Sequence, residues 1–311
     1  MKKFLASLAA ISVFLSGCGY FDFFGDLFGK KTETAETAET AETEPQTDEP
    51  EPYPVVIDGV VLDASPGEII CLSPALGEIL YEFGEGGRLT GRSGYCDYPA
   101  EIRGVPDMGT GIGLDTEKII GASPDLLLSS APVTAKDRII LEGAGIVTVI
   151  VPAPKNIEEF KDVYRIMGVI LYGAFVGAEE GERVFADISR ALYNPGAVDL
   201  KNFVYITENL ALATGDTLES SVLSCFGNNL AEDGAGYVYD KEKLLLNQPD
   251  VIILNGVYTT GDLLADEVFS QLDAVIEERI IVVDNAYFER PSARIVGLIS
   301  RMRTEYDMMR G

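Results

Sequence analysis

The side chains that most often carry out catalysis or hold metal ions are scarce in this sequence. The 311 residues include no histidine, which removes the commonest metal ligand and the commonest general base. Ser-His-Asp and Cys-His sites are therefore excluded, as are histidine-rich zinc or manganese sites. We accordingly predict that the chain is not an enzyme, has no cofactor and holds no metal site of its own. Carboxylate-based chemistry is the enzymatic alternative that remains.

Two carboxylate-rich segments share one residue pattern, at 115–128 and again 125 residues later at 240–253. Each begins with an aspartate, continues with Glu-Lys and a pair of apolar residues, and ends with Pro-Asp and a short apolar run. The aspartate suits a helix N-cap, the glutamate suits the first helical turn, and the apolar run suits a strand that is buried on both faces. The repetition predicts two similar α/β halves produced by duplication.

Further strand and helix patterns alternate around these repeats. Strands are predicted at 68–72, 89–91, 147–151, 203–207 and 280–283, and helices at 74–83, 220–226 and 292–309. This alternation predicts mostly parallel sheets covered by helices. Residues 156–194 form the longest helical region, with breaks expected at Gly173 and Gly177. Its second helix, 178–193, lies between the two halves and is predicted to be a spine that joins them.

Residues 1–18 have the features of a lipoprotein signal peptide. Two lysines precede an apolar stretch at 4–15, which as a helix would span roughly 18 Å and so fall short of the roughly 30 Å hydrocarbon core of a membrane. The ending Leu-Ser-Gly-Cys resembles a bacterial lipobox, which predicts that Cys18 is lipidated. An ordinary signal peptide with a chance cysteine is the alternative.

Residues 19–54 are predicted to be a disordered acidic tether. Aromatic residues between 20 and 28 would lie at the membrane surface, where aromatic rings are favoured. From 32 to 54 the sequence has eight acidic residues and no basic ones, with Thr-Ala-Glu at a period of three that matches neither a helix face nor a strand face. The chain is thus expected to be extracytoplasmic and anchored to the cell membrane through its N-terminal lipid.

The formal net charge of −26 argues against nucleic acid as a partner, because phosphate binding requires clustered Lys and Arg. So acidic a protein is suited to docking on a basic surface. The alternative is that the charge serves solubility alone.

The three cysteines beyond residue 18 match no metal-binding motif. Cys71, Cys96 and Cys225 are widely spaced, and because their number is odd at least one must be free. Cys71 ends a predicted strand and Cys96 lies in the next loop, so one alternative is a disulfide between them. The other is that all three are small buried hydrophobic residues.

Glycines alternate at 109–113, in a pattern that suggests a dinucleotide-binding loop. That fingerprint needs its third glycine one residue later and a buried strand directly before it, whereas 103–107 is polar and contains Pro106. We therefore predict a loop in which backbone approaches a ligand or the opposite half of the chain.

Several segments together resemble one family. These are 72–75 with Glu78 and Leu80, 91–99, the two repeats, and 287–292 with Arg294. In order and spacing they are similar to the substrate-binding lipoproteins of iron-siderophore and vitamin B12 (cobalamin) ABC importers, over residues 66–310. The resemblance implies the class III periplasmic-binding-protein fold, with an N-terminal α/β lobe at 55–155, a helical linker with the spine helix at 156–196 and a C-terminal α/β lobe at 197–311.

The resemblance also implies a function and its residues. The protein would act as a monomer that captures a metal chelate, an iron-siderophore or a corrinoid, between its lobes and delivers it to an ABC permease with its ATPase. Glu117 and Glu242 would dock on the permease. Ligand contacts are expected from Tyr95, Ser73, Arg92, Asp97, Tyr237, Tyr287 and Arg290. Asp97 and Arg290 have an alternative role, namely to pair or to cap. The chain departs from the vitamin B12 receptors in having no tryptophan. A non-transport cell-surface binding or scaffold module on the same fold is the alternative function.

Overall fold

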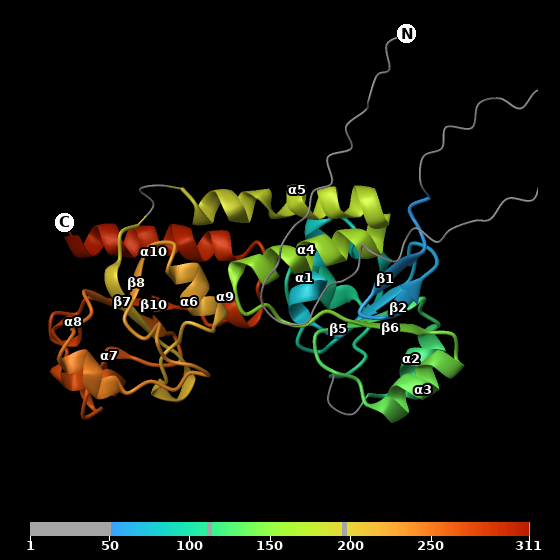
Figure 1. The fold of residues 1–311 in the computed structure, drawn as a ribbon. Helices are drawn as coiled ribbons and strands as arrows, with labels where there is room; N and C mark the ends of the chain where they lie inside the picture. The colour runs from blue at the N-terminus through green and yellow to red at the C-terminus, as the bar shows by residue number, and fades with distance from the viewer. Residues whose placement is uncertain (1–50, 111–113, 195–197, 311) are drawn as a thin grey trace, which may run out of the picture. The chain divides into compact units, whose positions relative to one another are not determined.

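Two four-stranded parallel sheets form the centre of the protein. The computed structural model describes residues 51–110, 114–194 and 198–310, and Figure 1 shows their elements. The first sheet has the order β4 (Leu89–Arg92), β3 (Ile69–Cys71), β5 (Leu126–Ser129) and β6 (Val147–Ile150). The second has the order β8 (Gly227–Asn229), β7 (Lys201–Ile206), β9 (Val251–Asn255) and β10 (Ile280–Val283). In both sheets the strands that come second, first, third and fourth along the chain lie in that order, so the predicted duplication is visible in the topology.

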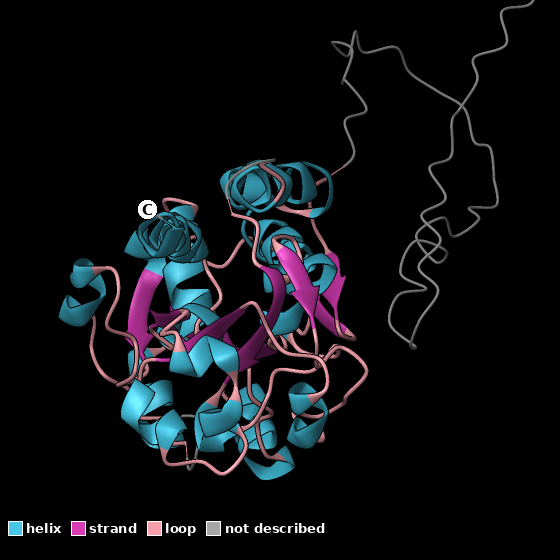
Figure 2. Ribbon diagram, turned by 90° about the vertical axis from the view of Figure 1, so that its left-hand side faces the viewer, coloured by secondary structure: helices cyan, strands magenta, loops and turns pink. Residues whose placement is uncertain are grey.

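Helices cover both faces of the sheets (Figure 2). The N-terminal lobe has α1 (Pro74–Glu82), α2 (Thr116–Ala122) and α3 (Ala135–Gly143). The C-terminal lobe has α6 (Leu218–Leu223), α7 (Thr260–Leu264), α8 (Asp273–Ile276), α9 (Ala286–Glu289) and α10 (Ile295–Arg310). Short 3-10 turns lie at η1 (Gly86–Arg88), η2 (Ala100–Gly104), η3 (Glu208–Leu210), η4 (Lys241–Leu245) and η5 (Phe269–Gln271). None of the described helices is long and apolar enough to cross a bilayer.

One hydrophobic core runs through both lobes. Alternate residues of each central strand point to opposite faces, so Leu126 and Leu128 join this shared core while Leu127 joins a smaller cluster that belongs to the N-terminal lobe alone. In the second sheet, Val251 and Ile253 likewise contribute to the shared core. The linking helices and α10 complete it. Because the lobes share buried side chains, they are joined more firmly than two domains on a flexible linker.

The linking helices are α4 (Ile157–Tyr172) and α5 (Ala174–Leu192), which are separated only by Gly173 at φ 85°. They pack antiparallel at very close range. A Cβ on Gly168 would lie 2.0 Å from the carbonyl oxygen of Gly177, and one on Gly181 would lie 2.5 Å from that of Tyr164. The predicted break at Gly177 is therefore wrong. This glycine lies inside α5, where its lack of a side chain lets the two backbones meet.

The repeated segments occupy matching places in the two lobes, where the first forms the α-helix α2 and the second the shorter 3-10 helix η4. Asp115 caps α2 by accepting from the Lys118 backbone N–H, and Asp240 accepts from the Glu242 N–H at the start of η4. The aspartate of each Pro-Asp pair then accepts hydrogen bonds from the backbone at or just before the neighbouring strand. The Asp125 carboxylate accepts from the Gly67 and Glu68 N–H groups just before β3, at 2.8 and 2.9 Å. The Asp250 carboxylate accepts from the Asn202 N–H in β7 at 3.1 Å.

One further element was not predicted, and one of the two cysteine alternatives is excluded. A hairpin of β1 (Val55–Ile57) and β2 (Val60–Leu62), with both turn residues at positive φ, precedes the first sheet and was not predicted. Cys71 and Cys96 are buried but free, so the disulfide alternative is wrong. Burial raises the pKa of the Cys96 thiol to about 11. The signal peptide, Cys18, nearly all of the tether and residues 111–113 of the glycine loop lie outside the described residues.

Candidate ligand-binding site

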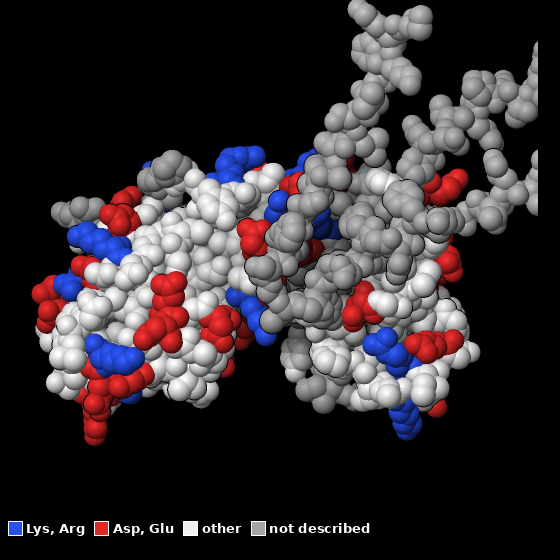
Figure 3. All heavy atoms as spheres, in the orientation of Figure 1, with Lys and Arg blue, Asp and Glu red and all other residues white. Residues whose placement is uncertain are grey.

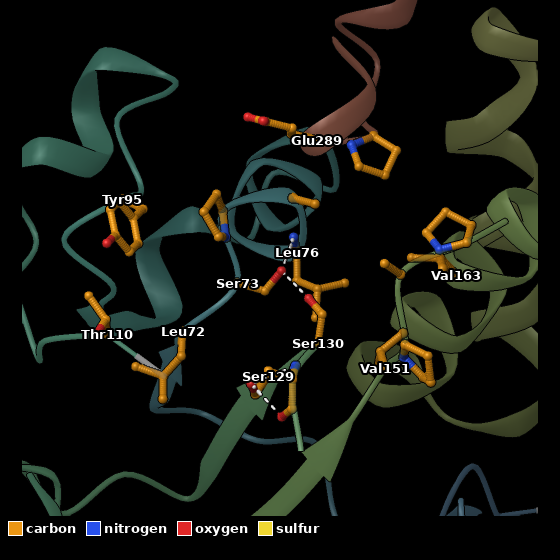
Figure 4. A pocket seen from close by; sticks show the side chains of 17 residues that line it. Leu72, Ser73, Leu76, Tyr95, Thr110, Ser129, Ser130, Val151, Val163 and Glu289 are labelled. Carbon is orange, nitrogen blue, oxygen red and sulfur yellow. Dashed lines mark hydrogen bonds between the residues drawn. The ribbon is translucent and has the colours of Figure 1, made fainter. Parts of the chain in front are cut away.

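A pocket of about 340 Å³ opens at the carboxyl ends of β3, β5 and β6 (Figure 4). Strand β4 lies on one side of β3, and β5, the strand that follows β4 in the chain, lies on the other side of β3. The pocket is therefore at the point where the strand order reverses. Crevices at such points are the usual ligand sites of parallel α/β sheets. Seventeen side chains line it. All come from the N-terminal lobe and from Val163 of α4 except Glu289 and Pro291, which come from the C-terminal lobe.

Serine hydroxyls provide several of the polar groups in the pocket wall. Ser73 follows β3 and caps α1, with its Oγ accepting from the Leu76 N–H at 3.5 Å. Ser130 follows β5 and donates its hydroxyl to Ser73 Oγ, and Figure 4 shows these two side chains facing each other. Most other lining side chains are apolar, including Leu72, Leu76 and Val151. An apolar surface with a few fixed hydroxyl groups is typical of small-molecule sites.

Tyr95 lies at the edge of this pocket with 63 % of its surface exposed. Its loop is held by Ser93, whose Oγ accepts from the Tyr95 N–H at 3.3 Å. An exposed ring beside an apolar pocket is available to stack on a ligand. Of the predicted ligand-contacting residues, Tyr95 and Ser73 are the two that the structure places in the pocket lining.

The other five predicted ligand residues lie outside that lining. Asp97 and Arg290 form an ion pair between the lobes at 2.5 Å, so the alternative that they pair is confirmed. Arg92 ends β4 half-buried and donates to the Ser93 carbonyl at 2.9 Å. Tyr237 donates its hydroxyl to Glu219 at 3.1 Å, and Tyr287 packs beside the Arg294 guanidinium.

Two carboxylates of α1, one buried and one half-buried, hold the chain that enters α10. Glu78 is 2 % exposed and accepts from the Ser292 hydroxyl at 2.6 Å and from the Arg294 guanidinium at 3.2 Å. Glu82 accepts from the Ala293 N–H at 2.8 Å and from the Tyr164 hydroxyl at 2.6 Å. Burial raises the pKa of Glu82 to about 7 and also raises that of Glu78, although the hydrogen bonds oppose the shift. These contacts tie the first lobe to the second beside the pocket.

Several lining residues were not predicted. Ser129 ends β5 and Ser130 directly follows it, and the rule that ligands bind at strand carboxyl ends would have identified them. Glu289 reaches the pocket from another lobe, and the sequence contains no signal for that approach. Glu117 and Glu242 are both exposed, in the first turns of α2 and η4, at matching places in the two repeats.

Charges of both signs are interspersed on the described surface drawn in Figure 3, which shows no continuous basic face there. A surface of this kind does not suit binding to the phosphate backbone of a nucleic acid.

Comparison with known proteins agrees with this architecture. Residues 69–194 match the sequence model of the family described as periplasmic binding protein. A vitamin B12-binding protein of Photorhabdus laumondii is 26% identical over 76% of this chain and 86% of its own length.

Two solved structures share the fold. A possible iron-binding, periplasmic solute-binding protein from Staphylococcus epidermidis has a TM-score of 0.64 and 22% identity, and the match covers 78% of this chain and 99% of that one. A protein of an ABC-type Fe³⁺-hydroxamate transport system from Saccharomonospora viridis has a TM-score of 0.60 and 20% identity, with 82% and 99% covered. These relatives are named for binding and transport, not catalysis, in agreement with the prediction that the chain is not an enzyme. The predicted resemblance to the periplasmic-binding-protein family, with its two-lobed α/β fold, is confirmed.

Proposed function

We propose that this chain is the extracytoplasmic substrate-binding lipoprotein of an ABC importer, which captures a metal chelate of the siderophore or corrinoid type and delivers it to the permease. The observation that carries the proposal is the pocket at the lobe junction, where apolar walls, two facing serines and an exposed tyrosine meet. The vitamin B12-binding name of the Photorhabdus relative supports the same ligand class. The protein performs no chemistry in this role, because the donors of the chelate itself hold the metal.

The two lobes are suited to presenting a ligand with little rearrangement. They share one core, and α4 and α5 meet backbone to backbone at Gly168 and Gly177. The permease would then recognise the loaded protein through one contact on each lobe. We assign these contacts to Glu117 and Glu242, whose alternative role is only to stabilise the first turns of their helices.

Saturable binding of one chelate class tests the function. We expect calorimetric titration with ferric trihydroxamates, ferric catecholates, haem and cobalamins to show one-to-one binding of at least one class. Ser130→Phe should fill the pocket and weaken that binding at least about tenfold, because a group of benzyl size replaces a hydroxyl opposite Ser73.

Ser300→Phe, on the exposed face of α10, is the matched control and should bind as the wild type does. If the folded wild type binds none of these ligands, the non-transport scaffold becomes the better interpretation. Thermal melting of both variants separates a blocked pocket from a damaged fold.

The lipid anchor at Cys18 has its own test. We expect Cys18→Ala to move the protein from the membrane fraction to the soluble fraction, because the tether has no membrane span and stable attachment requires the acyl chains. Cys225→Ala, which removes a half-buried free thiol in the C-terminal lobe, should remain with membranes. Fractionation after a high-salt wash measures both, and a Cys18→Ala protein that still sediments with membranes would show that the anchor lies elsewhere.

A further inference from the structure

The pocket has an unusual charge balance for a protein that would take up metal chelates. Its lining contains one carboxylate, Glu289, and no lysine or arginine among the described residues. Figure 4 shows the Glu289 side chain extending from the C-terminal lobe along the edge of the pocket opposite Ser129. An anionic ligand in this pocket would therefore meet a negative charge without a basic partner in the lining.

Two arginines of the segment that carries Glu289 and Pro291 are already paired. Arg290 is 21 % exposed at its side chain and lies 2.5 Å from Asp97, and Arg294 lies 3.2 Å from Glu78. Arg92 lies outside the lining, and its guanidinium donates to the Ser93 carbonyl at 2.9 Å. Arg290 and Arg294 each have an anion beside them, so these two arginines provide little free positive charge for a ligand.

The C-terminal lobe extends the acidic side of the site. Glu289 accepts from the Asn285 amide at 2.5 Å, and Asn285 in turn accepts from the buried Tyr205 hydroxyl at 3.2 Å. In the same lobe, Glu219 accepts from the Tyr237 hydroxyl at 3.1 Å. Glu289, Asn285 and Tyr205 therefore form one hydrogen-bonded group that ends at the pocket.

From these contacts we propose that the site selects metal chelates by charge: it accepts chelates of zero or positive net charge and disfavours polyanionic ones. Neutral or cationic trihydroxamates and amide-bearing corrinoids fit this description, whereas ferric tris-catecholates and carboxylate-rich chelates do not. Glu289 is the specificity-determining residue, and Asp97 assists by keeping Arg290 neutralised. The inference rests on the proposed function, because it presupposes that the pocket binds chelates.

Matched ligands that differ only in charge test this selection. One pair is a linear ferric trihydroxamate with a free terminal amine and the same chelate with that amine succinylated. The other is a cobalamin and its derivative in which one peripheral amide is hydrolysed to a carboxylate. With the full chain we expect calorimetry to show tighter binding of the less anionic member, by about three- to tenfold per unit charge, and a preference that shrinks as salt is added.

Single-residue variants show which side chains cause the preference for the less anionic ligand. Glu289→Gln should reduce the preference about three- to tenfold, and Asp97→Asn should change it in the same direction because Arg290 loses its counter-ion. Glu142→Gln, on the exposed surface of α3, should leave it unchanged.

Two further results overturn the inference. In one, the wild type binds the more anionic member of a pair, or a ferric tris-catecholate, as tightly as the less anionic member or more tightly. That result would leave the proposed function standing. The other is a preference that Glu289→Gln does not alter. If the protein binds neither ligand pair, nor haem, nor the catecholate, the proposed function is overturned, and the inference with it.

Discussion

Replacing Glu117 and Glu242 together by alanine is expected to reduce chelate uptake almost to zero while the isolated protein still binds its ligand. The two carboxylates are exposed and occupy matching positions of the two repeats, one on each lobe. If each enters an arginine pocket of the permease, its loss leaves a buried cation unpaired, at a cost of about 2–5 kcal/mol in the complex. The cost falls below about 1 kcal/mol if the contact stays hydrated. Each single change should therefore lower uptake, and the double change should remove both points of attachment.

Uptake of a labelled chelate by cells, at equal amounts of lipoprotein, measures this effect. Glu158→Ala is the matched control, because Glu158 is also an exposed glutamate in the first turn of a helix, α4, but is not part of the repeat. Wild-type uptake by the double variant would refute the docking role. So would loss of ligand binding in either single variant, because the residues would then belong to the pocket.

The large features of the fold were accessible from sequence because they depend on local chemistry that occurs twice. An N-cap aspartate, a first-turn glutamate and Pro-Asp before an apolar run specify a helix and strand without reference to distant residues. The structure adds why Pro-Asp recurs: Asp125 and Asp250 each accept a backbone N–H at the start of the neighbouring strand. The hairpin before the first sheet was also accessible, since Asp58-Gly59 between apolar residues is a strong hairpin signal.

Other features depend on tertiary contacts that no local pattern contains. A glycine such as Gly177 is typical of a helix break when only the sequence is considered. Its role depends instead on Gly168 of α4, because the Gly168 backbone occupies the space that a side chain at position 177 would need. Strand β8 is a polar Gly-Asn-Asn segment without an apolar pattern, so it is defined only by its pairing with β7. The approach of Glu289 to the pocket and the pairing of Arg290 with Asp97, 193 residues away, likewise follow from how the lobes meet.

The second large expected effect is a loss of stability when Arg294, at the junction between the lobes, is replaced. Its guanidinium is one of two donors to Glu78, a carboxylate that is 2 % exposed, and it also lies over the Tyr98 ring at 4.9 Å. Arg294→Met should lower the free energy of unfolding by about 3–5 kcal/mol at pH 7, because Glu78 is left buried with only the Ser292 hydroxyl as a donor. A surface pair behaves differently, and Arg301→Met, which removes a partner of Glu305 on α10, should cost less than about 1 kcal/mol.

A double variant and a change of pH distinguish two causes of the lost stability, namely the unpaired Glu78 carboxylate and the lost packing of the Arg294 side chain. Burial already raises the pKa of Glu78, and Arg294 opposes that shift, so its removal raises the pKa further. A carboxyl group with a raised folded-state pKa destabilises the fold increasingly as pH rises above its unfolded value. The deficit of Arg294→Met should therefore shrink between pH 7 and pH 5, and Glu78→Gln/Arg294→Met should recover most of it at pH 7. Urea unfolding at both pH values measures this, and a double variant no more stable than Arg294→Met would assign the loss to the packing of Arg294 on Tyr98 and Tyr287 instead.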